Sequence, residues 1–495
     1  MVDLIIEKLI LYATLYLDLE SEDVVFVRNG LLHALGVIAP YQGEIDIEEI
    51  KKLSSPLPII DELKKIKENL SVDDIGNIMS LISPRPKDVI KKFNEIKERE
   101  GADQAVSYLY NLSIHNNYLM SSDGYLNVEW LYEGEINDIM LSINTFKPTE
   151  LETSSSIYPK CDLCYSNVGL FNSRNDLSKS NLRVIPIKLI NEDWFFQLSK
   201  YSYYSEHSIL VNLEHIPMYI TKKTVQNELL FLDQFPNFFI GINSDLKNVG
   251  SSHLSHMHYE CGKRDLLITH AKPRYILRKK EIPDCEIEYL DWHISCFKLR
   301  SKNKSSIFKL SEIIINNFKK HNDDEIGLVG DDNGVRHSSM IILSTKSGDT
   351  YTVYLIPRNN YNTKEYPSGI FNTRYENLNI KDEPIGLMES AGFFILPARL
   401  KDEMNLMIEI LSSTNYSISD IIESNSSLEK HIPFINNLVV KYGRKNSREA
   451  ASALVKYEIG KISEKILKDN SIFKDTIDGQ LALFRFLESI ELEVK

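Results

Sequence analysis

The chain has 495 residues and a hydrophobic fraction of 43%, which is enough apolar material for two or three domains with large cores. Its 57 lysines and arginines are outnumbered by 70 aspartates and glutamates, so the net charge is −13. A general nucleic-acid-binding protein carries a basic face, and a chain with an excess of acidic residues argues against one. We therefore expect no nucleic-acid partner. A small local anion site remains compatible with this charge.

The N-terminus and the cysteine usage indicate a cytoplasmic protein. Residues 1–8 predict the start of an amphipathic helix, because a basic leader, an apolar run and a cleavage site are all missing. No stretch approaches 18 uncharged apolar residues, so we expect no membrane span and no membrane partner. Five cysteines in a long chain do not resemble a disulfide framework, which favours a reducing compartment.

The first 150 residues predict a mainly helical region. In residues 89–96, Val89, Phe93 and Ile96 fall on one helical face. The Pro84-Arg85-Pro86 segment marks the break before this helix, since a residue that precedes proline leaves the helical region. A polar, serine-rich connector at 149–156 is the expected domain boundary.

From about residue 158 to 300 the pattern predicts an α+β unit. Short segments rich in β-branched and aromatic residues predict strands at 183–187, 194–198 and 208–213. Residues 224–234 predict a helix. Strands followed by a helix are typical of an α+β arrangement.

A second unit of the same character is expected after residue 300, followed by helices. Residues 340–344 and 351–356 predict a strand pair joined through Ser347-Gly348-Asp349. We therefore predict an α+β fold with antiparallel sheets and with helical N-terminal and C-terminal regions. The expected domains are residues 1–155, 156–300, 301–400 and 401–495.

The segment from Gly250 to His258 carries three histidines behind Gly250-Ser251-Ser252. Histidines two residues apart on an extended segment point to one face. Imidazole is a good nucleophile toward phosphorus when its other ring nitrogen is held by an acceptor. The glycine and the serines can offer backbone N–H groups and hydroxyls to phosphate oxygens. The alternative interpretation is a polar loop that contains histidines by chance.

Cys161 and Cys164 form a Cys-x-x-Cys segment, whose spacing brings two thiolates to one tetrahedral ion. The chain has no second such segment, so the other two zinc ligands would be histidines, with His207 and His256 as candidates. The alternative is a pair of reduced structural cysteines. His215 is interpreted as a turn residue.

These segments together resemble the galactose-1-phosphate uridylyltransferases of the type found mainly in Gram-positive bacteria, which belong to the histidine-triad superfamily. The resemblance covers nearly the whole chain. It rests on the segments at residues 84–86, 117–119, 128–130, 158–169, 183–187, 194–207, 233–258, 385–389 and 395–400.

The resemblance implies a two-step transfer of UMP and a fold of two histidine-triad-like units. His258 would attack the α-phosphate of UDP-glucose and release glucose 1-phosphate. Galactose 1-phosphate would then take the uridylyl group from His258 and leave as UDP-galactose. The expected partners are therefore a nucleotide sugar and a sugar phosphate, and the family suggests a homodimer.

The resemblance also implies roles for individual residues. Beside the nucleophile His258, the expected catalytic residues are Ser252 and Glu260. The expected nucleotide contacts are Asn167, Arg183, Asn243 and Ser251. The expected ligands of a structural zinc ion are Cys161, Cys164, His207 and His256, and four protein ligands would leave no open position.

At two places the sequence departs from the family in residues that bear on the reaction. The family has Gln two residues after the nucleophile, where this chain has Glu260. An ionised carboxylate cannot donate a hydrogen bond to a phosphoryl oxygen, although it can activate water as a base. In the second unit, residues 371–380 lack the histidines that the family carries there. Their absence bears on which acceptor the protein uses.

Three functions therefore remain open from the sequence. The first is a uridylyltransferase that acts on a hexose 1-phosphate. The second is a nucleotidyl hydrolase, or a transferase with an altered acceptor, on the same scaffold. The third is a catalytically silent protein that binds a nucleotide sugar.

Overall fold

The structure is a computed structural model of the whole chain. It describes residues 1–119, 127–145, 158–171, 179–200, 202–251, 253–414 and 417–495. The expected connector at 149–156 and the predicted catalytic residue Ser252 lie outside the described residues. The chain divides into two compact units. Unit 1 comprises residues 1–126, 152–216 and 256–262, and unit 2 comprises residues 127–151, 217–255 and 263–495.

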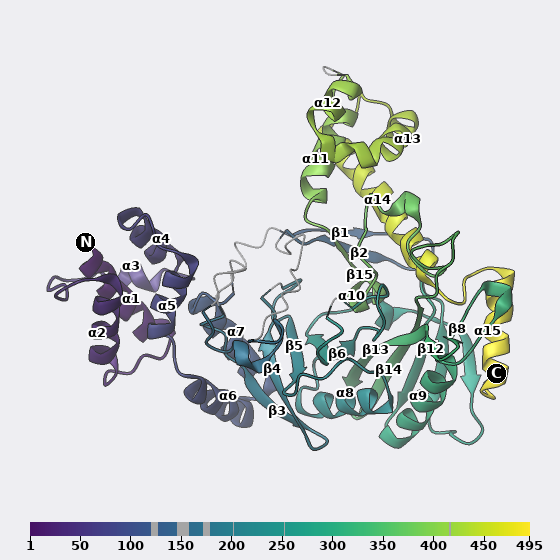
Figure 1. Cartoon of the computed structure of the whole chain (residues 1–495), viewed down its shortest axis with the longest axis horizontal. Helices are drawn as coiled ribbons and strands as arrows, with labels where there is room; N and C mark the ends of the chain where they lie inside the picture. Colours follow the sequence, from purple (N-terminus) through teal and green to yellow (C-terminus); the bar gives the residue numbers. More distant parts are fainter. Residues whose placement is uncertain (120–126, 146–157, 172–178, 201, 252, 415–416) are drawn as a thin grey trace. The chain divides into compact units, whose positions relative to one another are not determined.

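The N-terminal part of unit 1 is helical, as predicted (Figure 1). The break at Pro84-Arg85-Pro86 is confirmed, because one helix ends at Ile82 and the next begins at Pro86. Ser71 caps the first of these helices by accepting a hydrogen bond from the Asp74 backbone N–H. The helices are α1 (Val2–Tyr16), α2 (Val24–Leu35), α3 (Ile47–Lys51), α4 (Leu57–Ile66), α5 (Val72–Ile82), α6 (Pro86–Glu100) and α7 (Ala102–His115).

The sheet of unit 1 is antiparallel. Its strands are β3 (Ile185–Leu189), β4 (Glu192–Leu198), β5 (Ser208–Asn212) and β7 (His258–Gly262), and they pair in that order. The predicted strands at 183–187, 194–198 and 208–213 are confirmed, each with a shift of no more than two residues at either end. Strand β7 begins at His258, so the predicted nucleophile lies on a rigid element.

Unit 2 contains a larger antiparallel sheet. Its strands pair in the order β6 (Phe239–Ile242), β13 (Ser338–Ser347), β14 (Thr350–Asn359), β10 (Phe297–Ser301), β9 (Glu286–Leu290), β8 (Pro273–Arg278) and β16 (Glu493–Val494). The predicted pair β13–β14 is confirmed. Helices α8 (Lys222–Gln234) and α9 (Lys304–Phe318) pack on this sheet (Figure 1).

Residues 128–143 correct the expectation of a mainly helical first 150 residues. They form strands β1 (Val128–Tyr132) and β2 (Ile139–Ile143). Strand β2 pairs antiparallel with β1 and parallel with β15 (Phe393–Leu396). Ile139, Leu141 and Ile143 lie on one face of β2 in the core, and Ser142 on the other face is buried as well.

The C-terminal part of unit 2 is helical. The helices are α10 (Leu387–Ser390), α11 (Leu400–Ser412), α12 (Ile418–Ser424), α13 (Ile432–Tyr442), α14 (Arg448–Asn470) and α15 (Ile477–Ser489). A buried apolar cluster joins β2 and β15 to α11, α13 and α14. The predicted α+β fold with helical N-terminal and C-terminal regions is confirmed. The division into four domains stays a prediction.

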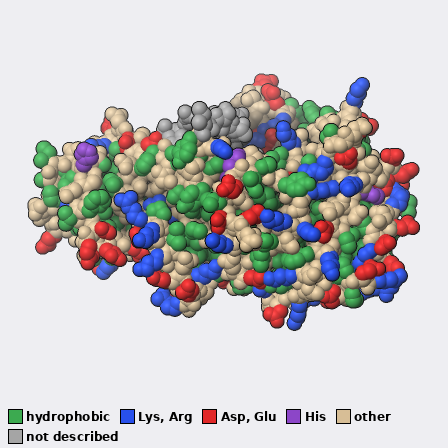
Figure 2. All heavy atoms as spheres, turned by 60° about the horizontal axis from the view of Figure 1, so that its bottom comes forward, with side chains coloured by type: hydrophobic (Ala, Val, Ile, Leu, Met, Phe, Trp, Pro, Cys, Tyr) green, Lys and Arg blue, Asp and Glu red, His purple; other side chains and the backbone are tan. Residues whose placement is uncertain are grey.

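The described surface is mixed in charge. On the face that Figure 2 shows, lysine and arginine side chains are interspersed with aspartate and glutamate side chains. In the described part of the chain, no helix combines the length and the apolar character that crossing a bilayer requires.

Candidate active site and metal centre

Strand β7 places His258 and Glu260 on one face of the unit 1 sheet. The two residues are separated by Tyr259, and side chains two residues apart on a strand point to the same side. Both are largely covered: His258 is 9% exposed, and the Glu260 side chain is 18% exposed. The predicted nucleophile and the residue that departs from the family therefore lie on one face.

A backbone carbonyl fixes the ring of His258. Its Nδ1 atom lies 2.8 Å from the carbonyl oxygen of His256. A carbonyl oxygen only accepts, so Nδ1 donates the hydrogen bond and carries the proton. In the neutral ring the lone pair is then on Nε2, which is the form a nucleophile requires.

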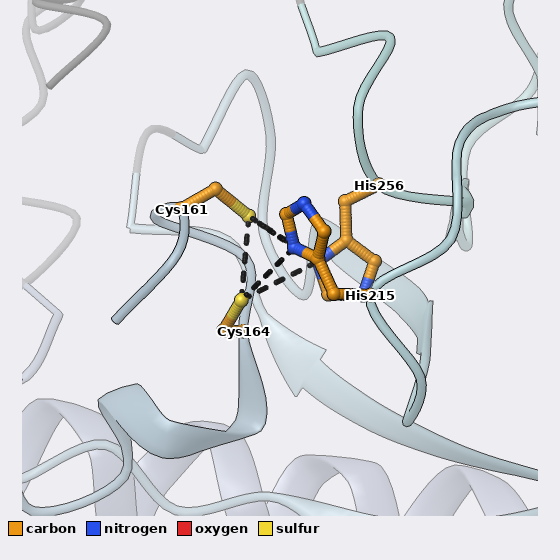
Figure 3. A group of neighbouring side chains, drawn as sticks. All are labelled: Cys161, Cys164, His215 and His256. Atoms are coloured by element: carbon orange, nitrogen blue, oxygen red, sulfur yellow. Dashed lines mark hydrogen bonds between the residues drawn. The ribbon is translucent and has the colours of Figure 1, made fainter. Parts of the chain in front are cut away.

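Four side chains of unit 1 form a group that can hold a metal ion: Cys161, Cys164, His215 and His256 (Figure 3). The two sulfur atoms are 3.6 Å apart, and the distances from sulfur to Nδ1 are 3.2–3.8 Å. A tetrahedral zinc ion bound at about 2.3 Å to sulfur and about 2.0 Å to nitrogen has ligand-to-ligand edges of about 3.3–3.8 Å. The group therefore has the size of a zinc site.

The electrostatics of the group also fit a cation. Burial raises the pKa of the Cys161 thiol to about 12. A thiol in such a place becomes a thiolate at neutral pH only when a cation stabilises it. The Nε2 atom of His256 lies 2.8 Å from the Asn212 carbonyl oxygen. This bond puts the proton on Nε2 and turns the lone pair of Nδ1 toward the two sulfur atoms.

The group that can hold a metal ion contains His215 in the place where His207 was expected. Strands β5 and β7 are antiparallel, and Val211 pairs with His258. The segment after β5, which holds His215, therefore meets the segment before β7, which holds His256. His207 stands at the other end of β5, opposite Gly262, and a strand rises about 3.3 Å per residue. Six residues separate Gly262 from His256, so His207 is roughly 20 Å away along the sheet.

His207 instead lies beside Glu260. Its Nε2 atom is 4.0 Å from a carboxylate oxygen of Glu260. The His207 ring stacks on Tyr203 at a centroid distance of 5.0 Å and an interplanar angle of 23°. The place of His215 follows only from the pairing of β5 with β7, because a histidine just after β5 then meets one just before β7.

Comparison with known proteins identifies the family, although no family model matches the sequence. A galactose-1-phosphate uridylyltransferase of Caldanaerobacter subterraneus subsp. tengcongensis is 35% identical over 98% of this chain and 97% of its own length. The enzymes of the same name from Clostridium acetobutylicum and Bacillus subtilis are 32% and 31% identical, over 97% and 94% of this chain and 98% and 93% of their own.

The chain belongs to the galactose-1-phosphate uridylyltransferase family. The resemblance given by the sequence motifs is thus confirmed, as is the expectation of a nucleotidyltransferase family. Among solved structures, the yeast Ap4A phosphorylase in complex with AMP aligns over 63% of this chain and 87% of its own. Its sequence identity is 12% and its TM-score is 0.34.

Two of the residues expected to contact the nucleotide, Asn167 and Arg183, donate hydrogen bonds to backbone carbonyls of unit 1. The Asn167 amide donates to the carbonyl oxygens of Cys161 and Cys164 at 2.9 and 2.8 Å, so it holds the turn between the two cysteines. The Arg183 guanidinium is buried and donates to the carbonyl oxygens of Pro84, Ser180 and Leu182. Burial lowers the pKa of Arg183 to about 10.

The other expected contacts belong to unit 2. The Asn243 side-chain oxygen accepts a hydrogen bond of 2.7 Å from the Leu387 backbone N–H at the start of α10. The Ser251 hydroxyl lies 3.3 Å from the Met218 sulfur. Their role toward a nucleotide stays a prediction.

Proposed function

We propose that this protein transfers UMP between UDP-glucose and a hexose 1-phosphate through a uridylyl group carried on His258. The observation that carries the proposal is the hydrogen bond from His258 Nδ1 to the His256 carbonyl, which puts the lone pair on Nε2. The family supplies the substrate class, since the relatives are named galactose-1-phosphate uridylyltransferases.

The chemistry would run in two displacements at phosphorus. In the first, Nε2 of His258 forms a bond to the α-phosphorus while the bond from that phosphorus to the bridging oxygen breaks, and glucose 1-phosphate leaves. In the second, a phosphate oxygen of the acceptor attacks the same phosphorus, and the bond to nitrogen breaks. His258 is regenerated, so two accessible steps replace one hard displacement.

We further propose zinc as the metal of the four-residue group formed by Cys161, Cys164, His215 and His256. Two thiolates and two imidazoles are the donor set that zinc favours. The tetrahedral edges support this choice, as does the hydrogen bond that orients His256. With four protein ligands the ion would be structural and would brace the segment just before His258.

A cytoplasmic homodimer is the remaining part of the proposal. None of the five cysteines forms a disulfide, which suits a reducing compartment. Light scattering of the purified protein measures the oligomeric state.

The test of the proposal is the mass of a trapped intermediate. The protein is incubated with UDP-glucose, quenched and measured intact by mass spectrometry. We expect a uridylyl adduct that is lost in His258→Ala and kept in the matched control His270→Ala, whose side chain is 63% exposed. Absence of both an adduct and any turnover of UDP-glucose would refute the proposal.

Hydrolysis is the second candidate, because Glu260 lies on the face of β7 that carries His258 and can act as a base toward water. Release of UMP from UDP-glucose without an adduct, and without any need for an acceptor, would favour it. Galactose 1-phosphate and glucose 1-phosphate are compared as acceptors in the same assay.

A further inference from the structure

Glu260 poses a physical problem for the proposed reaction. A carboxylate on the same face as the nucleophile repels the phosphates of an incoming nucleotide sugar, and it can activate water against a phosphorylated histidine. A uridylyltransferase with Glu at this position therefore needs a positive charge close to that carboxylate.

His207 is the group that stands there. Ile209 of β5 pairs with Glu260 of β7, and His207 lies two residues before Ile209 on the same face. This diagonal relation brings His207 Nε2 to within 4.0 Å of the Glu260 carboxylate. The side chains of His207 and Glu260 are only 4% and 18% exposed, so solvent screens their interaction weakly.

The surroundings hold His207 in this position. Its ring packs against those of Tyr203 and Tyr204, with centroid distances of 5.0 Å to each. Gly262 makes room for Tyr204, because a Cβ atom at this glycine would lie 2.7 Å from the tyrosine ring. The Tyr204 hydroxyl also donates to the Cys261 carbonyl at 3.5 Å.

The backbone before His207 is constrained as well. Glu206 has a φ of +58°, in the left-handed region that non-glycine residues rarely adopt. Its carboxylate accepts a hydrogen bond of 2.7 Å from the Ser107 hydroxyl of α7. Such a conformation persists only where the surroundings enforce it, and here it directs the chain into β5 with His207 facing Glu260.

We infer that His207 is a positioning residue that, as an imidazolium, neutralises Glu260 beside the nucleophile His258. The inference rests on the proposed uridylyl transfer. Neutralisation does two things: it removes the repulsion of the nucleotide phosphates, and it makes the carboxylate a weaker base toward water. The pair thereby favours transfer of the uridylyl group over its hydrolysis.

The test is a double-mutant cycle on the rate of adduct formation with UDP-glucose. His207→Asn removes the positive charge that His207 places beside Glu260, so we expect adduct formation to slow by about tenfold or more and UMP release per adduct to rise. Glu260→Gln removes the negative charge and should speed adduct formation. In the Glu260→Gln background, His207→Asn should cost less than about threefold. His270→Asn, at an exposed site, is the matched control.

A merely structural role for His207 predicts the opposite pattern. His207→Asn would then be equally harmful in the wild-type background and in the Glu260→Gln background, and that outcome overturns the inference. An unchanged rate in His207→Asn overturns it too, while the adduct on His258 would still support the proposed function.

A measurement without substrate separates the two proposals. The ring nitrogens of His207 are observed by NMR at neutral pH in the full-length protein. We expect a protonated ring in the wild type and a neutral ring in Glu260→Gln. A neutral ring in the wild type overturns the inference even if the adduct forms. Absence of both an adduct and any turnover of UDP-glucose in the wild type refutes the proposed function and, with it, the role inferred for the pair.

Discussion

Replacing Asn167 by alanine should weaken metal binding rather than nucleotide binding. Asn167 is only 3% exposed, and its amide donates to the carbonyl oxygens of Cys161 and Cys164 at 2.9 and 2.8 Å. These two bonds close the turn that sets the distance between the two sulfur atoms. Alanine leaves both carbonyls without this donor and lets the turn open.

The size of the effect follows from the two bonds. A buried hydrogen bond contributes about 1 kcal/mol net, so two contribute about 2 kcal/mol. At about 1.4 kcal/mol per factor of ten, zinc affinity should fall roughly 30-fold if the loss is expressed only in the metal-bound state. Substitutions of groups that orient metal ligands cost about 10–100-fold, which agrees with this value.

The assay is competition for zinc with a fluorescent chelator at fixed pH, beside a titration with UDP-glucose. Asn436→Ala is the matched control, because Asn436 lies on an exposed face of α13. The reasoning is refuted if Asn167→Ala binds zinc like the wild type but loses affinity for UDP-glucose. Asn167 would then be the nucleotide contact that the sequence first suggested.

Three further predictions concern single side chains. Zinc content should fall in His215→Asn and be retained in His207→Asn, as measured by metal analysis after dialysis; the reverse would restore the ligand set first expected from the sequence. Arg183→Met should lower the free energy of unfolding by about 2–4 kcal/mol, since it removes charge-assisted bonds to three carbonyls, and it should leave the KM for UDP-glucose unchanged. Burial raises the pKa of Glu228 well above its usual range, so the folded protein holds this proton above the unfolded pKa of about 4.5. The contribution of Glu228 to stability should therefore be lost as pH rises above about 4.5, and urea unfolding at several pH values should show Glu228→Gln gaining stability relative to the wild type as the pH rises.

Local patterns were enough to predict most of the elements that carry the site. The strands around Trp194 and Ser208 were predictable because short runs rich in β-branched and aromatic residues lie there between turn residues. The hairpin β13–β14 was predictable for the same reason, with Gly348 at its turn.

Long-range pairing explains what the sequence did not predict. Strand β2 is the central strand of its sheet because β15, about 250 residues later, pairs with it in parallel, and no local pattern reveals such a partner. The ligand His215 was missed for a related reason. Its proximity to His256 follows only from the register of β5 on β7, whereas spacing along the chain gave no preference between His207 and His215.

The register also explains why His256 and His258 can serve two different tasks. Each ring is fixed by a backbone carbonyl, but through opposite nitrogens: His256 donates from Nε2 to Asn212, and His258 donates from Nδ1 to His256. The lone pairs consequently fall on Nδ1 of His256, toward the cysteines, and on Nε2 of His258. Because the carbonyl that orients His258 belongs to His256, an ion bound by His256 also fixes the acceptor of the nucleophile. The proposed metal ligand His256 and the proposed nucleophile His258 are thus joined by one hydrogen bond through the backbone, so the proposed structural metal would bear directly on the geometry of the proposed reaction.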